Sequence, residues 1–435
     1  MFVLCWTNVG IEGATNKQQR AAERHSTTLS TQEGDEEDAV FIRSVAARSC
    51  LSLDGLLQIH IHLDTLMAFP APVWLAVQDE LLGQGEPDEG AVTCFDNFDD
   101  ETLFGLFHLT RPCITFITDA IRIRMKTTDM KKPVLPVDAM LMVALNYYAH
   151  GVSSNAVLQR VGLSEEDCPT TIVGIVSGVL AGMTDHFISF PLTVKDRVNV
   201  AKKTENFCGI PGVLGILAPA HFKIRASPYD RDMYRSFVNT LSYTSVVSQF
   251  IFDSDGNILS VEKCCAGSTY EQEMWETSFK GREMEDGLHG PFWVIGGKGY
   301  QLSQHVLTPV SEPSNDKEIR FNEAHAKIHN VLQTTLGIIK RRFRCLMQLG
   351  FAQEGGLNNK SNIIKSCSVL HNIAKKFSVP PPPAAIVMEP VYPGKRQPGQ
   401  VEINPEALEA RQKVINAHFS GASRRTQVVT AYAGE

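Results

Sequence analysis

The stretch at residues 212–225 changes its pattern of apolar positions at Pro219. Residues 213–217 are continuously apolar, which predicts a buried strand. After the proline, apolar and charged residues alternate over 221–225, which predicts a strand with one buried and one solvated face. We therefore expect a hairpin here, forming the first pair of strands in an α/β sheet.

The remaining pattern predicts more strands, followed by helices. Further strands are expected at 242–252, 258–264 and 292–295, and helices at 270–280, 322–346 and 361–377. Asp253 to Gly256 reads as a hairpin turn, because Asp-Gly supplies residues that accept a positive φ. Three strands, a helix, a strand and then helices is the order of a ribonuclease-H-like fold, a mixed sheet flanked by helices.

Helical patterns precede this α+β region. Asp99 or Asp100 can cap a first helix, in which Pro112 produces either a bend or a division into two helices. Further helices are expected from Pro136, over 155–161 and over 170–187.

The two last helices have the spacing of a helix-turn-helix, with Gly162 in the turn. Such a pair can bind DNA, and it can equally be plain helix packing. The carboxylates of Glu165, Glu166 and Asp167 stand at the entry of the second helix, where they would repel phosphates.

These patterns suggest five regions. They are an acidic disordered leader (1–38), a helical N-terminal region (39–95), a helical helix-turn-helix-like domain (96–205), a ribonuclease-H-like domain (206–379), and a Pro-rich linker with one helix at 405–419 and a disordered tail (380–435).

The composition of the 435-residue chain is that of a soluble globular protein. Its net charge of −7 argues against a chain that is basic throughout, so any nucleic-acid contact has to come from local patches. No run approaches the roughly 20 apolar residues that span a membrane. The ten cysteines have no metal-ligand spacing, which favours reduced thiols in an intracellular protein.

Three late motifs carry a family resemblance. They are Phe321-Asn-Glu-Ala-His325, Arg342-Phe-Arg-Cys-Leu346 and Val369-Leu-His-Asn372, and the 212–225 stretch adds Gly215, His221 and Ile224. Together they resemble the signature of Harbinger (PIF/Harbinger) transposases and of the nuclease-like proteins derived from them, in the DDE superfamily. The resemblance covers roughly residues 95–375, with a weaker match at 410–419. It implies a ribonuclease-H-like domain, a DNA partner and a nuclear location, with the cytoplasm as the other possibility.

The resemblance also implies phosphodiester cleavage by two Mg²⁺ ions, which are hard cations that require anionic oxygen ligands. The family holds these ions with three acids, and their positions fall on Ala218, Gly297 and Gln333. All three acids are therefore replaced here, and we expect no catalytic residues, no metal site and no cofactor.

Other polar residues could substitute for the missing acids. Glu271 matches a further acidic position of the family, and Asp253 is matched as well; we interpret them as a solvated helix-start residue and a turn residue. Four histidines are interpreted as hydrogen-bonded core residues: His221, His325, His329 and His371.

A basic cluster at the end of the 322–346 helix is the best candidate for contact with phosphates. It comprises Lys340, Arg341, Arg342 and Arg344. A solvated face with local ion pairs is the alternative interpretation of the same charges.

The sequence thus predicts a domesticated Harbinger transposase-like protein, nuclease-inactive, that binds DNA, a protein partner or both. The alternative is a divalent-metal-dependent endonuclease that uses displaced acids and would need Mg²⁺. A third hypothesis is that the fold serves protein interaction and has no nucleic-acid role.

Overall fold

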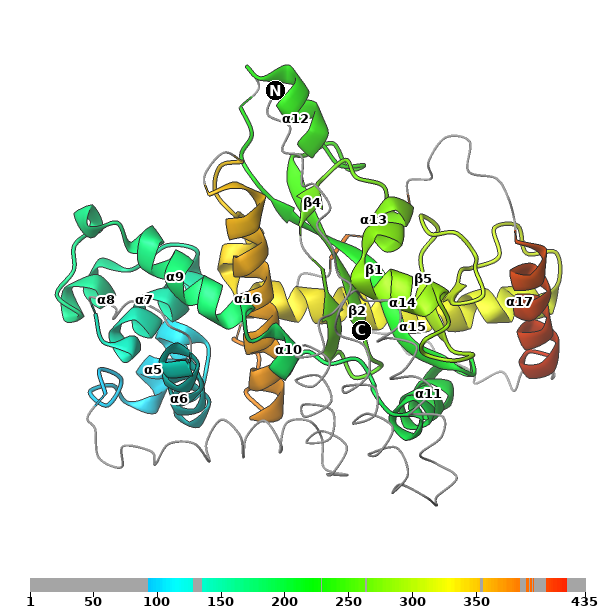
Figure 1. The fold of residues 1–435 in the computed structure, drawn as a ribbon, viewed down its shortest axis with the longest axis horizontal. Coiled ribbons are helices and arrows are strands. Elements are labelled where there is room, and N and C mark those ends of the chain that lie inside the picture. Colours follow the sequence, from blue (N-terminus) through cyan, green and yellow to red (C-terminus); the bar gives the residue numbers. More distant parts are fainter. Residues whose placement is uncertain are drawn as a thin grey trace, which may run out of the picture. The chain divides into compact units, whose positions relative to one another are not determined.

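Six strands of the described residues form one mixed sheet in the order β3-β2-β1-β5-β6, with β4 beside β2 (Figure 1). The computed structural model describes residues 93–127, 135–227, 229–262, 264–352, 355–383, 389–390, 392, 394 and 404–420. The strands are β1 (Val213–Lys223), β2 (Ser245–Phe252), β3 (Ile258–Val261), β4 (Cys265–Ala266), β5 (Trp293–Gly296) and β6 (Val306–Leu307). The pairs β1–β2 and β2–β3 are antiparallel, whereas β5 runs parallel to both β1 and β6.

Helices lie before, between and after the strands of this sheet. They are α11 (Val194–Cys208), α12 (Arg231–Phe237), α13 (Glu271–Thr277), α14 (Phe279–Glu285), α15 (Asp316–Arg342), the short 3₁₀ helix η2 (Arg344–Met347), α16 (Gly356–Lys376) and α17 (Pro405–His418). The helices α11 and α15 contact β1, α13 contacts β2, and α16 contacts β3. A mixed sheet flanked by helices agrees with the ribonuclease-H-like fold expected for the DDE superfamily. No helix among the described residues combines the length and the apolarity needed to cross a bilayer.

The predicted hairpin at residues 212–225 is wrong, because β1 runs unbroken through Pro219. Leu217 is the last residue of β1 that pairs with β5, and Pro219 pairs with Gln249 of β2 alone. One edge of the strand is therefore open beyond Leu217, and a proline without an N–H is tolerated at such an edge.

Other elements differ from the sequence pattern in their bounds. The helix expected at 270–280 is two helices, since the Ser278 hydroxyl accepts from the Gly281 N–H (2.9 Å) and donates to the Trp275 carbonyl (2.8 Å). The apolar pattern does not predict helix α11, although Thr193 and Asp196 form a capping box at its start. The Asp253–Gly256 turn is confirmed, with φ at Gly256 of 79°.

Helices also precede the sheet, and they share its core. They are α5 (Asp100–Phe107), α6 (Arg111–Thr127), α7 (Val137–His150), α8 (Asn155–Arg160), the 3₁₀ turn η1 (Glu165–Asp167), α9 (Pro169–Ala181) and α10 (Thr184–Phe187). Asp99 caps α5, and the pattern around Pro112 resolves into two helices. One continuous apolar cluster includes residues of α5 to α10 and of the sheet.

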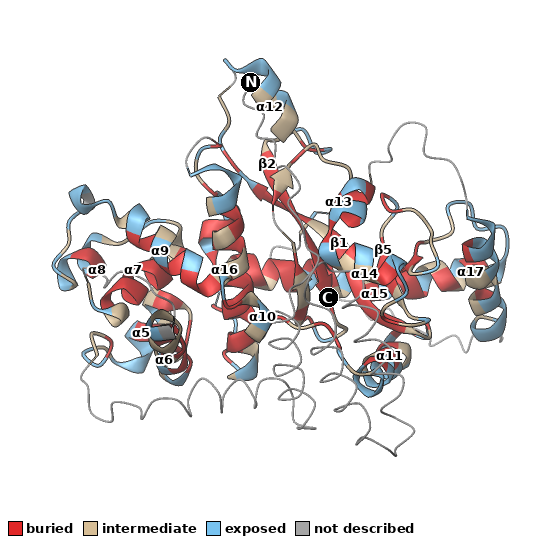
Figure 2. Cartoon of the chain, in the orientation of Figure 1, coloured by how far each residue is buried: buried red, intermediate tan, exposed pale blue. Residues whose placement is uncertain are grey.

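Helix α16 joins these two parts of the chain. It packs against α9, with the Ser366 hydroxyl donating to the Ser177 carbonyl at 3.0 Å. Figure 2 shows it largely buried. The leader at 1–38, and the 39–95 region up to residue 92, lie outside the described residues. Whether the helices before the sheet bind DNA stays a prediction.

The predicted C-terminal helix is confirmed as α17, and it packs against α15. The Arg411 guanidinium donates to the Thr308 carbonyl (3.1 Å), and that of Arg320 donates to the Phe419 carbonyl (2.6 Å). The chain after residue 380 is thus not only a linker, because parts of it return to the folded core.

Candidate functional site

The three positions at which the resemblance predicts acids line one cavity. Ala218 belongs to β1, Gly297 follows β5 and Gln333 lies on α15, and the cavity has a volume of about 40 Å³. The strand register explains the convergence: Leu217 pairs with Gly296 in parallel strands, so the residues after them emerge side by side. The cavity is large enough for one or more water molecules.

Helix α15 is aligned with the strand edge by a hydrogen bond. The His325 ring donates from Nε2 to the carbonyl of Gly296, the last residue of β5, at 3.0 Å. Gln333 is eight residues further along the same helix, which brings it to the cavity. The interpretation of His325 as a hydrogen-bonded core residue is confirmed, and burial lowers its pKa to about 4.

The residues present do not fit a pair of Mg²⁺ ions. Ala218 and Gly297 offer no side-chain oxygen, and Gln333 offers a neutral one. Within the described part of the chain, no group of three or more His, Cys, Asp or Glu side chains is arranged to hold a metal ion. We therefore derive no metal-dependent step at this cavity.

Glu271 borders this cavity and is the first residue of α13, so the predicted helix start is confirmed, but the prediction that the residue is solvated is wrong. The residue is 8 % exposed, and burial raises the pKa of its carboxyl group to about 7. The carboxylate packs directly on the backbone of Gly299, where a Cβ atom would come within 1.8 Å of Oε2. Glu271 is thus partly protonated near neutral pH, unlike an acid that holds a cation.

The other histidines differ in their surroundings. The Nδ1 atom of His221 lies 3.0 Å from the Ser245 hydroxyl, and Nε2 of His371 lies 3.0 Å from the Gly256 carbonyl. Both are buried, which lowers each pKa to about 3 and confirms the core interpretation. His329 is instead half-buried beside the cavity, with Nε2 3.6 Å from the place of a Cβ on Gly297.

Residues of the expected Pro-rich linker line the same cavity. They are Glu389, Pro390, Tyr392 and Gly394, which we call the C-terminal strap. The interpretation of this stretch as a linker without core contacts is therefore wrong for these residues. No sequence signal identified them, because a single Glu and a single Tyr in a proline-rich stretch carry no periodic pattern.

The predicted basic cluster divides into buried and accessible residues. Lys340 and Arg342 are 7 % and 3 % exposed, whereas Arg341 is half-buried and Arg344 is exposed. Lys340 Nζ donates to the His221 carbonyl (2.8 Å) and to Glu389 Oε2 (2.7 Å). The first two cations are therefore not available to a phosphate in this structure.

The signature motifs join distant segments through hydrogen bonds. Arg342 donates to the carbonyls of His108 (2.6 Å), Val379 (2.9 Å) and Pro380 (3.1 Å). Burial lowers its pKa to about 10. These bonds hold the end of α15 to two other parts of the chain.

Asn372 has a comparable role. Its Oδ1 accepts from the N–H of Ile258 (3.0 Å), and its Nδ2 donates to the carbonyls of Ile258 (2.8 Å) and Phe187 (2.9 Å). The side chain thus joins α16 to β3 and to the end of α10.

Asp253 is confirmed as a turn residue. Its Oδ1 accepts from the N–H groups of Asp255 (2.9 Å) and Asn257 (2.8 Å), which fixes the loop between β2 and β3. Asp230 caps α12, where it accepts from the N–H of Met233 at 3.1 Å. Neither aspartate lines the cavity.

Comparison with known proteins finds matches that include the strands and helices around the cavity. The family model described as "DDE superfamily endonuclease" matches residues 220–372. The protein named "Putative nuclease HARBI1" from Bos taurus is 26% identical over 334 residues, which cover 75% of this chain and 92% of the relative. Its counterparts from Homo sapiens and Xenopus laevis are 25% and 24% identical, with the same coverage. No solved structure matches the chain. The chain is thus similar to the DDE superfamily endonuclease family over residues 220–372, and to the proteins named "Putative nuclease HARBI1" over three quarters of its length.

Proposed function

We propose that this protein is a domesticated Harbinger transposase-like protein that does not cleave DNA and acts as a binding module for DNA, for a protein partner or for both. One observation carries the proposal: the three positions of the family acids meet at one cavity and bring no carboxylate to it. Two hard cations a few ångströms apart would repel each other there without compensation. A nuclear location is part of the same proposal.

A plasmid-nicking assay tests the catalytic half of this proposal. Supercoiled plasmid is incubated with the full chain in Mg²⁺ or Mn²⁺, and we expect no nicked or linear product above a protein-free control. Metal-dependent nicking that co-purifies with the folded chain would refute the inactivity.

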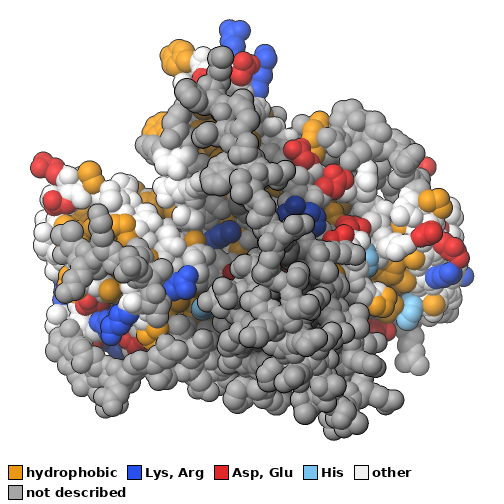
Figure 3. Space-filling view, in the orientation of Figure 1, with side chains coloured by type: hydrophobic (Ala, Val, Ile, Leu, Met, Phe, Trp, Pro, Cys, Tyr) orange, Lys and Arg blue, Asp and Glu red, His pale blue; other side chains and the backbone are white. Residues whose placement is uncertain are grey.

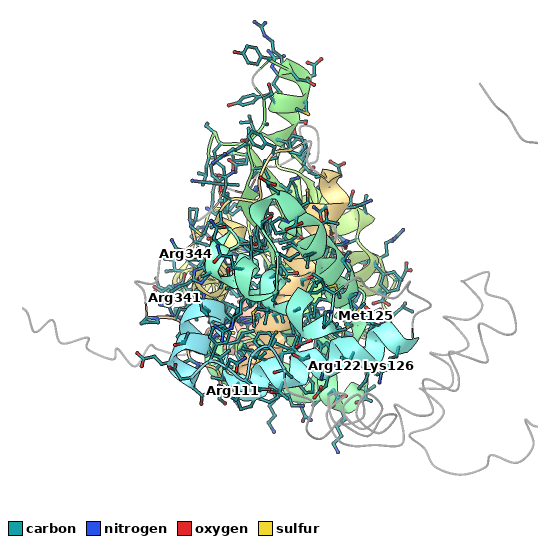
Figure 4. The ribbon with its side chains drawn as sticks, turned by 90° about the vertical axis from the view of Figure 1, so that its left-hand side faces the viewer. Arg111, Arg122, Met125, Lys126, Arg341 and Arg344 are labelled. Atoms are coloured by element: carbon teal, nitrogen blue, oxygen red, sulfur yellow. The ribbon has the colours of Figure 1, made fainter. Side chains whose placement is uncertain are left out.

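The accessible cations for DNA contact are fewer than the sequence suggested. In Figure 4, Arg341 and Arg344 lie at the left of the view, whereas Arg122 and Lys126 of α6 lie at its lower right. Arg111 and Arg122 already pair with Asp100 (2.7 Å) and Asp119 (3.3 Å). On the face drawn in Figure 3, acidic and basic side chains of the described residues are interspersed.

A gel shift at low salt tests the binding half. Lys126→Ala combined with Arg344→Ala should weaken binding to a DNA duplex and reduce its salt dependence, since both side chains are exposed. Lys413→Ala, an exposed cation on α17, is the matched control. Binding unchanged by the double variant removes this surface, and no shift at all favours a protein partner.

The alternative is an endonuclease that uses displaced acids, and one observation favours it. Glu271 and Glu389 both border the cavity, so two carboxyl groups lie near the positions of the lost acids. One of them, Glu389, is already paired with Lys340, and the other has a raised pKa. Nicking that Glu271→Ala abolishes, in a folded variant, would establish this alternative.

A further inference from the structure

The C-terminal strap is held on the molecule at three separate points. The first is an ion pair between Glu389 Oε2 and Lys340 Nζ, 2.7 Å apart. Their side chains are 11% and 9% exposed, so the pair is largely removed from water. The strap thus contributes a carboxylate to the interior of the domain.

The second and third points lie further along the strap. The ring of Tyr392 lies on the ring of His221, with centroids 4.3 Å apart, and its hydroxyl hydrogen bonds to that of Tyr243. Gly394 packs on the backbone of Gly299, where a Cβ atom would come within 2.1 Å of the amide nitrogen. Only glycine allows this approach, so the strap fits the rim of the cavity closely.

The ammonium group of Lys340 needs an anion. It is buried over the ring of Phe222, and its other oxygen partner, the His221 carbonyl, is uncharged. An unpaired buried charge is strongly unfavourable. Among the described residues, Glu389 is the carboxylate that forms an ion pair with Lys340, and it comes from the strap.

Glu389 lines the cavity, and its carboxylate also pairs with Lys340, which does not line it. Carboxylate and phosphate oxygens accept the same charge-assisted hydrogen bonds from an ammonium group. Removing Glu389 would therefore extend the cavity to a cation that has lost its anion.

We propose that Lys340 is the cation of a phosphate-binding site, that Glu389 occupies this site from within the chain, and that the C-terminal strap has to lift before a phosphate group can bind. The strap is then an autoinhibitory contact over the position of the lost acids. The proposal requires neither DNA binding nor cleavage, because inorganic phosphate is a sufficient ligand.

Acetylation of lysines by acetic anhydride, read out by peptide mass spectrometry on the folded full chain, tests this proposal. In the unaltered protein, Lys340 should react about tenfold or more slowly than the exposed Lys195 of α11. Tyr392→Ala and Glu389→Gln should each accelerate Lys340 by about tenfold. Glu409→Gln, which removes an exposed pair with Lys413, should leave it unchanged.

Inorganic phosphate separates an opened strap from an opened anion site. Millimolar phosphate should slow the acetylation of Lys340 in the two strap variants, compared with sodium chloride at equal ionic strength. Unaltered reactivity in Tyr392→Ala overturns the strap, and acceleration without protection by phosphate overturns the anion site.

Global unfolding is recognised by the buried Lys360 of α16, which would then react as well. In that case Tyr392→Phe, which keeps the ring and removes only the hydroxyl, is the deciding variant. Lys340 should still react faster in this variant than in Glu409→Gln, and equal rates would reject the proposal.

Discussion

Two sets of positions in this protein differ in whether they carry the polar side chains that the family resemblance predicts. Arg342 and Asn372 belong to signature motifs, and each side chain joins separate segments through three hydrogen bonds. The positions of Ala218, Gly297 and Gln333 meet at one cavity and carry no charge. The residues that hold the framework together are present, whereas those that would hold metal ions are absent.

The motifs of a family can therefore reflect the requirements of folding rather than those of catalysis. A buried polar group that loses its partner costs free energy in every copy of the folded protein. An acid that only holds a metal is under no such constraint, and its removal even relieves repulsion between neighbouring carboxylates. A fold can therefore persist when residues that serve only catalysis are replaced.

The largest expected effect comes from removing Arg342. Arg342→Ala leaves three carbonyl groups without their donor, and it should lower the free energy of unfolding by about 3–5 kcal/mol. Arg344→Ala, two residues away and exposed, should change it by about 0.5 kcal/mol or less. Urea unfolding measures both changes. Equal losses of unfolding free energy in the two variants would show that the hydrogen bonds of Arg342 do not stabilise the fold.

The next effect concerns the acid that remains at the cavity. Because burial raises the pKa of Glu271 from 4.5 to about 7, its neutral form stabilises the fold. This contribution is complete below pH 4.5 and is lost as the pH rises through about 7. Glu271→Gln should therefore gain on the unaltered protein by on the order of 3 kcal/mol between pH 4 and pH 9.

Unfolding by urea at a series of pH values measures this gain. Glu273→Gln, an exposed residue of the same helix, is the control and should show no such pH dependence. A difference that stays flat across the series would mean that Glu271 is ionised in the folded protein, as the endonuclease alternative requires.

The smallest effect is expected from restoring the acids. Ala218→Asp, Gly297→Asp and Gln333→Glu together should make thermal stability depend on Mg²⁺, with a gain on the order of 1 kcal/mol at several times the Kd. The neutral variant Ala218→Asn with Gly297→Asn should show no gain. A gain by the unaltered chain would favour a metal site built from other residues.

Much of the fold could be read from the sequence, because strands and long helices leave periodic apolar patterns. The strand at 292–295 and the helices α15, α16 and α17 follow directly from such patterns. Pro219 misled the prediction, since a proline interrupts a strand only where both edges are paired. Helix α15 also begins six residues before its predicted start, because Asn315 caps it there.

The amino-acid sequence alone shows that the positions at which the resemblance predicts acids carry Ala218, Gly297 and Gln333, because residue identity needs no structure. The surroundings of these positions, by contrast, depend on the tertiary structure. The burial of Glu271, the burial of Lys340 and the placement of Glu389 depend on contacts between residues far apart in the chain. Such contacts leave no local pattern, so the charge of this cavity could be known only from the folded protein.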